Sequence, residues 1–534
     1  MNATVRRALV AVIVVVLLGQ LAVQRLLHRG AAAGARAAPR VAMRIADGAL
    51  HMGRLTLQAC SIGGRQGDAL PSLAAWCTRF AVPEDWDHPG GRHIELAVAI
   101  VPAAAGSPDP DLVTFLDGGP GGAAREDYPA VAAALAPLRE RHALLLVDQR
   151  GTGGSNPLDC PALQAPSSSA DAPASAASPA SSAQLNADDE PALMAQRLTQ
   201  CLRQLQPHAA PQFYTTTAAV RDLEAVRQAL GAPRLDLIAV SYGTRVAQQF
   251  AARFPTAVRS VVLDSPVPNR LALLSEHARN LEHALQLLFA HCRRTASCAA
   301  RFQDPYATLY RLRDRLQAAP VPVTLPDPVT FVPMHLTLSA QDLAAVVRFD
   351  AYNSLTAALL PLMLDEAQRG NYVPLLGQKT LLTTDLGDHI TGALELSVIC
   401  AEDADLLVPR PEDAHTLLGN DAITRAQAAC RLWPKGSRPA DFHAPFHSTL
   451  PVLVLDGELD PVTPPAYGAQ IVAALPHARQ LIVAGQGHSV IAAGCMPRLV
   501  RRFVETLETT QLDAHCLDAL GPVPAFIDYD GAAP

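Results

Sequence analysis

A serine stands at the junction of an apolar strand and a helix near the middle of the chain. The segment LDLIAVSYGTRVAQQF, residues 235–250, begins with a short apolar run and continues as an amphipathic helix from about Tyr242. A buried strand that turns this sharply into a helix holds the intervening Ser241 exposed at its carboxyl end, an arrangement known as a nucleophile elbow. Gly243 leaves room for the turn, and Ala239 stands where the usual G-x-S-x-G pattern has its first glycine. A helix N-cap is the structural alternative, because serine is a preferred capping residue.

Further apolar strands occur on both sides of this junction. A helix over 219–230, closed by a glycine, leads into the elbow strand. Alternation of apolar residues predicts an early antiparallel strand at 94–100. Compact apolar runs predict the remaining strands at 112–116, 143–147, 258–263, 450–455 and 480–483. Because strands alternate with helices, we expect a mostly parallel central sheet flanked by helices. An elbow on such a sheet predicts the α/β-hydrolase fold.

Two glycine-rich loops follow predicted strands. The first, DGGPGG at 117–122, would let backbone N–H groups face a cavity, as an oxyanion hole requires. We therefore expect the N–H groups of Gly119 and Tyr242 to bind the oxyanion. The second loop, at 148–155, lacks the Lys-Ser/Thr pair of a phosphate-binding loop, so we predict a structural role for it.

The end of the chain supplies the partners that a nucleophilic serine needs. In this fold the catalytic residues follow the chain order Ser, Asp or Glu, His. Asp460 lies a few residues past one predicted strand, and His488 lies in a glycine-flanked loop past the next. These residues and Ser241 form the predicted catalytic triad. Asp456 and Glu458 are rival acids, but Asp460 is preferred because Pro461 and the following turn place it farther from the strand end.

The length of 534 residues predicts more than one unit. Residues 38–270 are expected to form the first part of the hydrolase core, with a Ser/Ala/Pro-rich surface insertion at 165–187. Residues 271–445 are mainly helical in pattern and predict a cap domain over the sheet, and 446–534 complete the core. The Ala/Arg/Gly-rich segment from 24 to about 50 is predicted to be a linker. The expected cap helices are 271–289, 306–316, 341–349 and 354–369.

The N-terminus predicts export. Two arginines precede an apolar run at 8–23, a pattern typical of a secretory signal. Residues 1–37 are therefore expected to be a signal peptide, cleaved near Ala-Arg-Ala at 35–37, or an uncleaved membrane anchor. A secreted, periplasmic or cell-envelope location follows, with the membrane as a partner only through that anchor.

Ten cysteines agree with an oxidising compartment. Proximity along the chain predicts five local disulfides, with buried free thiols as the alternative. The predicted pairs are Cys60/Cys77, Cys160/Cys201, Cys292/Cys298, Cys400/Cys430 and Cys495/Cys516. No C-x-x-C pair occurs, so neither a metal nor another cofactor is expected. The net charge of −7 and the lack of a dense basic run argue against nucleic acid as a partner.

Five motifs in order carry a family resemblance: DGGPGG, DQRGTGGSNPLDC, SYGT, LDGELDPVTP and GQGHS. Together they resemble the secreted tripeptidyl aminopeptidase and proline iminopeptidase branch of the α/β-hydrolases, with its TAP-like C-terminal region. The resemblance spans about 60–516 and implies a serine exopeptidase that acts on peptides with a free N-terminus and needs no metal. Asp117 replaces the first histidine of the proline iminopeptidase motif His-Gly-Gly-Pro-Gly, which argues against strict proline specificity.

An exopeptidase must recognise an ammonium group, and carboxylates in a partly desolvated pocket suit that task. Glu402 and Asp403 follow Cys400 in the predicted cap and are the expected substrate-binding acids. The alternative is a helix start or cap formed by these two acids. The triad alone does not separate a peptidase from a carboxylesterase or lipase-like hydrolase. A binding protein of the same fold without catalytic activity is the remaining alternative.

Overall fold

The computed structural model describes residues 43–63, 72–105, 111–163, 190–326, 331–389 and 392–532. The predicted signal or anchor at 1–37 and the predicted insertion at 165–187 lie outside the described residues. Within the described part of the chain, no helix is both long enough and apolar enough to span a membrane.

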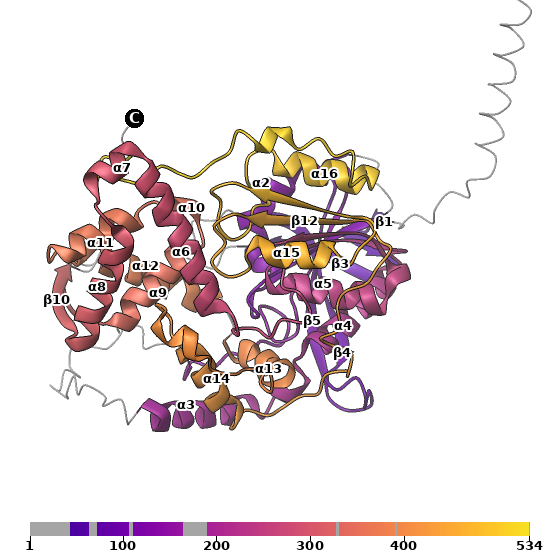
Figure 1. Ribbon diagram of the computed structural model, residues 1–534. Coiled ribbons are helices and arrows are strands. Elements are labelled where there is room, and N and C mark those ends of the chain that lie inside the picture. Colours follow the sequence, from indigo (N-terminus) through magenta and orange to yellow (C-terminus); the bar gives the residue numbers. More distant parts are fainter. Residues whose placement is uncertain are drawn as a thin grey trace, which may run out of the picture.

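Eleven strands form one sheet in the order β1-β2-β3-β4-β5-β7-β6-β8-β9-β12-β13 (Figure 1). From β7 to β13 neighbouring strands run parallel, whereas β1 to β5 form an antiparallel extension that joins at β7. The strands are β1 (Met43–Ala46), β2 (Ala49–Met52), β3 (Leu55–Ile62), β4 (Leu73–Pro83), β5 (His93–Val101), β6 (Leu112–Leu116), β7 (Leu144–Val147), β8 (Leu235–Val240), β9 (Val258–Asp264), β12 (Val452–Gly457) and β13 (Ala478–Val483). The predicted fold class is therefore confirmed.

The linker prediction is wrong at its C-terminal end. β1 and β2 lie within the segment assigned to a linker, and Gly48, with φ 76°, forms part of the turn between them. Each strand has only four residues, so neither gives a clear alternating pattern on its own. Leu50 and Met52 of β2 are buried, because pairing with β3 places them in the core.

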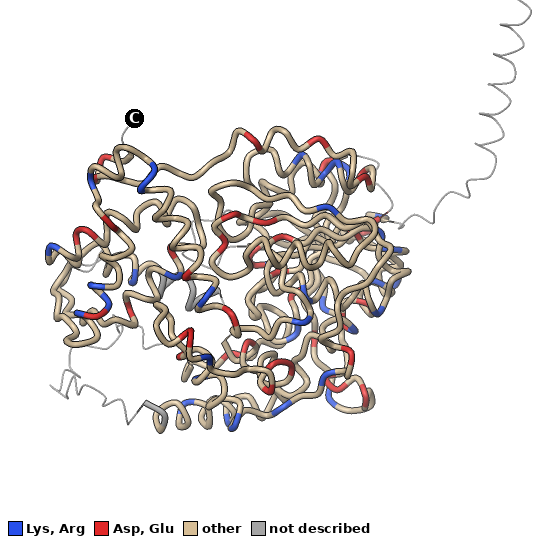
Figure 2. The backbone as a smooth tube through the Cα atoms, viewed as in Figure 1, with Lys and Arg blue, Asp and Glu red and all other residues tan. Residues whose placement is uncertain are grey.

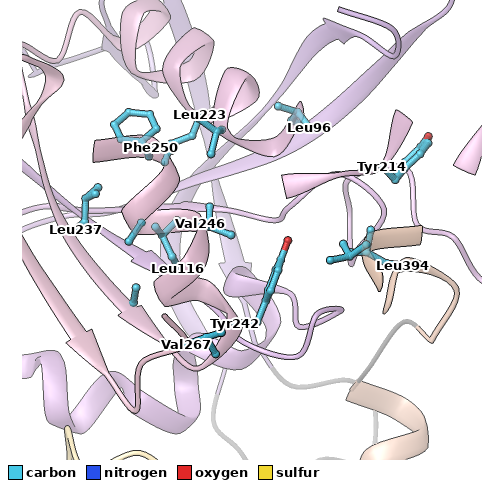
Figure 3. Close-up of a cluster of buried hydrophobic side chains, with 14 of the residues drawn as sticks. Leu96, Leu116, Tyr214, Leu223, Leu237, Tyr242, Val246, Phe250, Val267 and Leu394 are labelled. Atoms are coloured by element: carbon cyan, nitrogen blue, oxygen red, sulfur yellow. The ribbon is translucent and has the colours of Figure 1, made fainter. Parts of the chain in front are cut away.

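Each face of the sheet is covered by helices. In β8, Leu237 belongs to one apolar cluster and Ile238 to the other, as the two-residue period of a strand requires. The first cluster includes residues of α4 (Thr216–Leu230), α5 (Tyr242–Arg253) and α15 (Pro465–Val472), and the second includes residues of α2 (Ala124–Arg139) and α16 (Met496–Thr506). Figure 3 shows Tyr242, Val246 and Phe250 of α5 within the first cluster.

The chain between β9 and β12 is mainly helical. Its elements are α6 (His277–Arg294), α7 (Ala296–Arg301), α8 (Pro305–Ala318), the hairpin β10 (Val321–Pro326) and β11 (Pro333–Leu338), α9 (Ala340–Asp350), α10 (Ser354–Ala357), α11 (Leu360–Gln368), α12 (Val373–His389), α13 (Gly392–Glu402) and α14 (Asp421–Cys430). Helices α6, α8, α9, α11 and α12 share an apolar cluster of their own and gather at one side of the molecule (Figure 1). Helices α13 and α14 instead contribute to the first cluster of the sheet, the one that contains residues of α4, α5 and α15.

Helix boundaries in this region differ from the expected ones. The first helix begins at His277, six residues later than expected, and the helix expected over 354–369 is divided into α10 and α11. Pro361 lies in the first turn of α11. Backbone N–H groups there have no partner within the helix, so the N–H group that proline lacks costs no hydrogen bond. A proline within an apolar periodic run thus marks a new helix here.

All five predicted disulfides are present, and the described residues contain no free cysteine. One of them, Cys60–Cys77, joins strands β3 and β4. Another, Cys400–Cys430, joins α13 to α14. Several disulfides in one chain are typical of proteins from extracytoplasmic, oxidising compartments.

Basic and acidic residues are interspersed along the whole molecule (Figure 2). The side chain of Arg150, in the loop after β7, is completely buried, with 0% of it exposed. Its Nε and Nη2 atoms donate to the two carboxylate oxygens of Asp222 at 2.7 and 2.6 Å. Its remaining hydrogen bonds go to the backbone carbonyls of Pro83, Glu84 and Phe213. The second glycine-rich loop is thus structural, as predicted.

We predict that Arg150→Ala lowers the free energy of unfolding by about 3–5 kcal/mol, because it leaves Asp222 buried without its counter-charge. Urea denaturation measures the change. Arg501→Ala is the matched control: its ion pairs with Glu140 and Glu505 lie at the surface, away from Asp222, so their loss should cost no more than about 1 kcal/mol. Equal losses in both variants would contradict the structural role of Arg150.

Candidate active site

Ser241 adopts the backbone geometry of a nucleophile elbow. It joins β8 to α5 with φ 55° and ψ −125°, a conformation that residues other than glycine rarely adopt. Its N–H donates to the carbonyl of Asp264 at 3.0 Å. A Cβ atom on Gly243 would lie 2.3 Å from the carbonyl oxygen of Leu116, so only glycine permits the start of α5 to approach β6. The side chain of Ser241 forms no capping hydrogen bond, which excludes the N-cap alternative.

The predicted acid and base are hydrogen bonded to each other. Nδ1 of His488 lies 2.8 Å from Oδ2 of Asp460, and both side chains are almost fully buried. Oδ1 of Asp460 also accepts the N–H groups of Val462 and Thr463, each at 2.8 Å. Burial raises the pKa of Asp460, but the charge of His488 and these hydrogen bonds outweigh it and lower the pKa below its usual value. Asp460 is therefore a fixed carboxylate.

The charge state of His488 depends on the same pair. Burial lowers the pKa of His488, whereas the carboxylate of Asp460 raises it by its charge and by the hydrogen bond, so that the net pKa lies above the usual value. The backbone N–H of His488 donates to the carbonyl of Tyr352 at 2.7 Å, and the two rings lie 5.1 Å apart. The helical region between β9 and β12 therefore contacts the histidine directly.

The rival acids have other partners. Asp456 accepts a hydrogen bond from the side-chain amide of Gln480 at 2.8 Å, and burial raises its pKa to about 8. The carboxylate of Glu458 accepts the N–H of Gly485 at 2.7 Å. Of these three acids, the structure brings only Asp460 to the ring of His488.

Ser241, Asp460 and His488 follow the carboxyl ends of the parallel strands β8, β12 and β13. Because these ends share one edge of the sheet, the three residues are gathered at that edge. The structure describes both side chains, and no hydrogen bond joins Ser241 to His488. In free enzymes such contacts are often long and become short only with substrate bound.

Two stretches of backbone lie beside Ser241, the first glycine loop and the start of α5. In the first glycine loop, Gly119 has φ 107° and precedes Pro120 through a cis peptide bond. A Cβ atom on Gly118 would lie 3.1 Å from Cβ of Ser241, so this loop backbone passes directly beside the serine. The N–H of Tyr242 belongs to the first turn of α5, where amides have no partner within the helix. The oxyanion hole formed by the N–H groups of Gly119 and Tyr242 stays a prediction.

Glu402 and Asp403 are completely buried and have protein partners. Both oxygens of Glu402 accept hydrogen bonds from Thr216, from its N–H at 2.6 Å and its hydroxyl group at 2.8 Å. Asp403 forms an ion pair with Arg245 of α5 at 2.8 Å, and neither side chain is exposed. Both acids thus support the elbow helix, since Thr216 also contacts the hydroxyl group of Tyr242. This geometry favours a structural role over contact with a substrate.

Several polar residues beside the triad were not predicted. Arg348 of α9 donates to Nδ1 of His277 at 3.3 Å, and burial together with this cation lowers the pKa of His277 to about 3. Glu395 of α13 is partly buried, and its carboxylate forms no hydrogen bond or ion pair with another described residue. Burial raises the pKa of Glu395, and Arg348 lowers it. No sequence motif identifies these residues. They are recognised only from their position in the structure.

Comparison with known proteins identifies the class. Residues 111–493 match the alpha/beta hydrolase fold family, and the chain therefore belongs to it. Serine protease Hip1 of Mycobacterium tuberculosis is 25% identical over 476 residues, which cover 83% of this chain and 87% of the relative. The tripeptidyl aminopeptidase of Streptomyces coelicolor is 32% identical over 203 residues, 36% of each protein. A structure of proline iminopeptidase from Mycobacterium smegmatis is 16% identical and covers 80% of this chain and 98% of its own, with a TM-score of 0.34.

The fold, the elbow and these relatives place the chain among the serine hydrolases of the alpha/beta hydrolase family. Among the described residues, no group of three or more His, Cys, Asp or Glu side chains is placed to hold a metal ion.

The buried state of Glu402 gives a prediction about stability. Burial raises its pKa from 4.5 to about 8, although Arg245 and Thr216 oppose the shift. The folded state therefore holds this proton more tightly than the unfolded state. Its contribution to stability is complete below pH 4.5 and is lost as the pH rises through 8.

We expect the free energy of unfolding of the unaltered protein to fall relative to that of Glu402→Gln between pH 5 and 9, by at most about 1.4 kcal/mol per pH unit. Glutamine cannot ionise, so the variant lacks this component. Chemical denaturation of both proteins at a series of pH values measures the difference. Parallel pH profiles would show that Glu402 does not hold a proton in the folded state.

Proposed function

We propose that this protein is a serine exopeptidase that releases residues or short peptides from the free N-termini of peptides. The observation that carries the proposal is the arrangement of the elbow residue Ser241 and the Asp460–His488 pair at one edge of the sheet. Export by an N-terminal signal and action outside the cytoplasm belong to the same proposal, and the five disulfides support them.

The proposed mechanism follows from the hydrogen bonds. With its Nδ1–H donated to Asp460, His488 is left with Nε2 to accept the proton of the Ser241 hydroxyl group. The serine oxygen then attacks the scissile carbonyl, and the oxyanion is bound by the N–H groups of Tyr242 and Gly119. His488 returns the proton to the leaving amine. Water, deprotonated by His488, hydrolyses the acyl-enzyme and releases the N-terminal fragment.

The choice of peptides rests partly on the relatives, which include a serine protease and a tripeptidyl aminopeptidase. The choice of a free N-terminus needs a carboxylate that can reach the substrate. Glu395 is a better candidate than Glu402 or Asp403, because it is partly exposed and has no partner among the described residues. Burial is the largest cause of the raised pKa of Tyr352, and the charge of Glu395 raises it further. Glu395 therefore lies near Tyr352, whose ring lies beside that of His488.

A carboxylesterase or lipase-like hydrolase and a binding protein without activity are the alternatives. A peptide p-nitroanilide with a free amine, its N-acetylated form and a p-nitrophenyl ester distinguish them. An exopeptidase should have its highest kcat/KM on the free amine and a much lower value on the blocked peptide. Preference for the ester with no peptide cleavage would favour an esterase, and no turnover of any substrate would favour a binding protein.

We predict that Asp460→Asn lowers kcat on the free-amine substrate by roughly 10³- to 10⁴-fold, because the base loses its orienting carboxylate. Asp456→Asn is the matched control. It keeps an acceptor for Gln480 and resembles the protonated aspartic acid expected at pH 7, so its kcat should change less than about threefold. Ser241→Ala should abolish turnover. An Asp456→Asn loss as large as that of Asp460→Asn would refute the assignment of the acid.

We further predict that Glu395→Gln lowers kcat/KM on the free-amine peptide by roughly 10-fold or more, with less than about a twofold change on the ester. The carboxylate contacts only the substrate that carries an ammonium group. Glu402→Gln, on the same face of α13 seven residues later, is the control and should affect both substrates equally. Substrate-selective loss in Glu402→Gln but not in Glu395→Gln would instead support the assignment made from the sequence.

A further inference from the structure

Asp264 connects the two halves of the candidate active site. It is the last residue of β9, and its side chain is buried. Its backbone carbonyl accepts the N–H of Ser241 at 3.0 Å, so the end of β9 holds the elbow. Strand β9 lies between β8 and β12, the strands that lead to Ser241 and Asp460.

The carboxylate of Asp264 binds the segment that follows His488. Oδ1 accepts the N–H of Val490 at 2.9 Å, and Oδ2 accepts the N–H of Ile491 at 3.1 Å and the hydroxyl group of Ser489 at 2.7 Å. The next residue, Ser265, adds a contact, since its hydroxyl oxygen accepts the N–H of Ser489 at 2.8 Å. Burial raises the pKa of Asp264, and the hydrogen bonds from Val490, Ser489 and Ile491 oppose that shift. The position of the histidine loop therefore depends on this carboxylate.

Three residues with a strained backbone lie at the same place. Ser241, Ser265 and Ser489 have φ values of 55°, 54° and 66°, in a region that favours glycine. Such conformations persist only where surrounding contacts fix them. Asp264 contacts two of these three residues directly: its backbone carbonyl accepts the N–H of Ser241, and its carboxylate accepts the hydroxyl group of Ser489.

Four elements surround His488 with polar groups. They are Asp460 from the loop after β12, Asp264 from β9, His277 from α6 and Tyr352 from the segment after α9. Burial, together with the charge of Arg348 of α9, keeps His277 uncharged. Asp460 and Asp264 are the two carboxyl groups among these neighbours, and only Asp460 contacts the ring of His488.

We propose that Asp264 is a positioning residue that fixes His488 relative to Ser241, holding the nucleophile by its backbone and the histidine loop by its carboxylate. The inference rests on the proposed serine peptidase function. Asp264 does not touch the reacting atoms; it acts through the loop that carries the base. A displacement of about 1 Å in a catalytic group can cost roughly 100-fold in rate, so loss of these hydrogen bonds should be visible in kcat.

The test is Asp264→Asn, in which an NH₂ group replaces one acceptor oxygen and opposes the loop N–H groups. We expect kcat on the free-amine peptide to fall by roughly 10- to 100-fold, with KM changed less than about twofold. The acidic limb of the kcat/KM profile should move to lower pH, because the charge of Asp264 raises the pKa of His488. Asp236→Asn is the matched control: this buried residue of β8 binds Arg259 and Ser260, so its loss should lower stability without changing kcat or the profile.

Ser489→Ala keeps the test decisive if Asp264→Asn does not fold. It removes one hydrogen bond to the carboxylate, and kcat should fall by a few-fold. Where both single variants fold, their effects on kcat should be less than multiplicative in the double variant, since they share that bond. Unchanged kcat and pH profile in the folded variants would overturn the proposal, and fully multiplicative effects would do the same. A parent protein without hydrolase activity would refute the proposed function as well, whereas an active parent with unaffected variants refutes this inference alone.

Discussion

The strained turn at Ser241 is the constraint on which the site depends. A serine with φ 55° is held there because Gly243 lets α5 start against the end of β6 and because the carbonyl of Asp264 binds the serine N–H. Tyr242 and most of the following residues of α5 are buried in the core, and this burial stabilises the turn. The same geometry points the serine side chain away from the helix and leaves the first amides of α5 without intrahelical partners. In the proposed mechanism, this one local conformation supplies both the nucleophile and half of the oxyanion hole.

The acid and the base depend on a second close approach. A Cβ atom on Gly457 would lie 1.9 Å from the carbonyl oxygen of Gly487, so the end of β12 and the loop after β13 approach each other where only glycine fits. Gly487 in turn lies against the carbonyl of Tyr352, where a Cβ atom would meet it at 2.3 Å. The region between β9 and β12 therefore packs directly onto the histidine loop. Its conformation therefore contributes to the position of the base.

The sequence predicted what local patterns determine. The elbow, the parallel strands, both glycine loops and the disulfides all have signatures within a few residues or pairs of nearby cysteines, and the structure contains them. Long-range packing could not be predicted: Glu402 binds Thr216, 186 residues away, and Asp403 binds Arg245, 158 residues away. Nothing near an acidic dipeptide indicates whether it is buried with such partners or faces a substrate. For the same reason Glu395 and Asp264, which have no motif of their own, emerge only from the structure.

The central claim is that Ser241 is a nucleophile activated by His488 and Asp460. The most direct measurement is covalent labelling of the folded protein with a fluorophosphonate, followed by peptide mapping by mass spectrometry. The account predicts a single adduct on Ser241, formed at a rate that rises with pH as His488 loses its proton. An adduct on another residue, or none on the folded protein at any pH between 5 and 9, would contradict it.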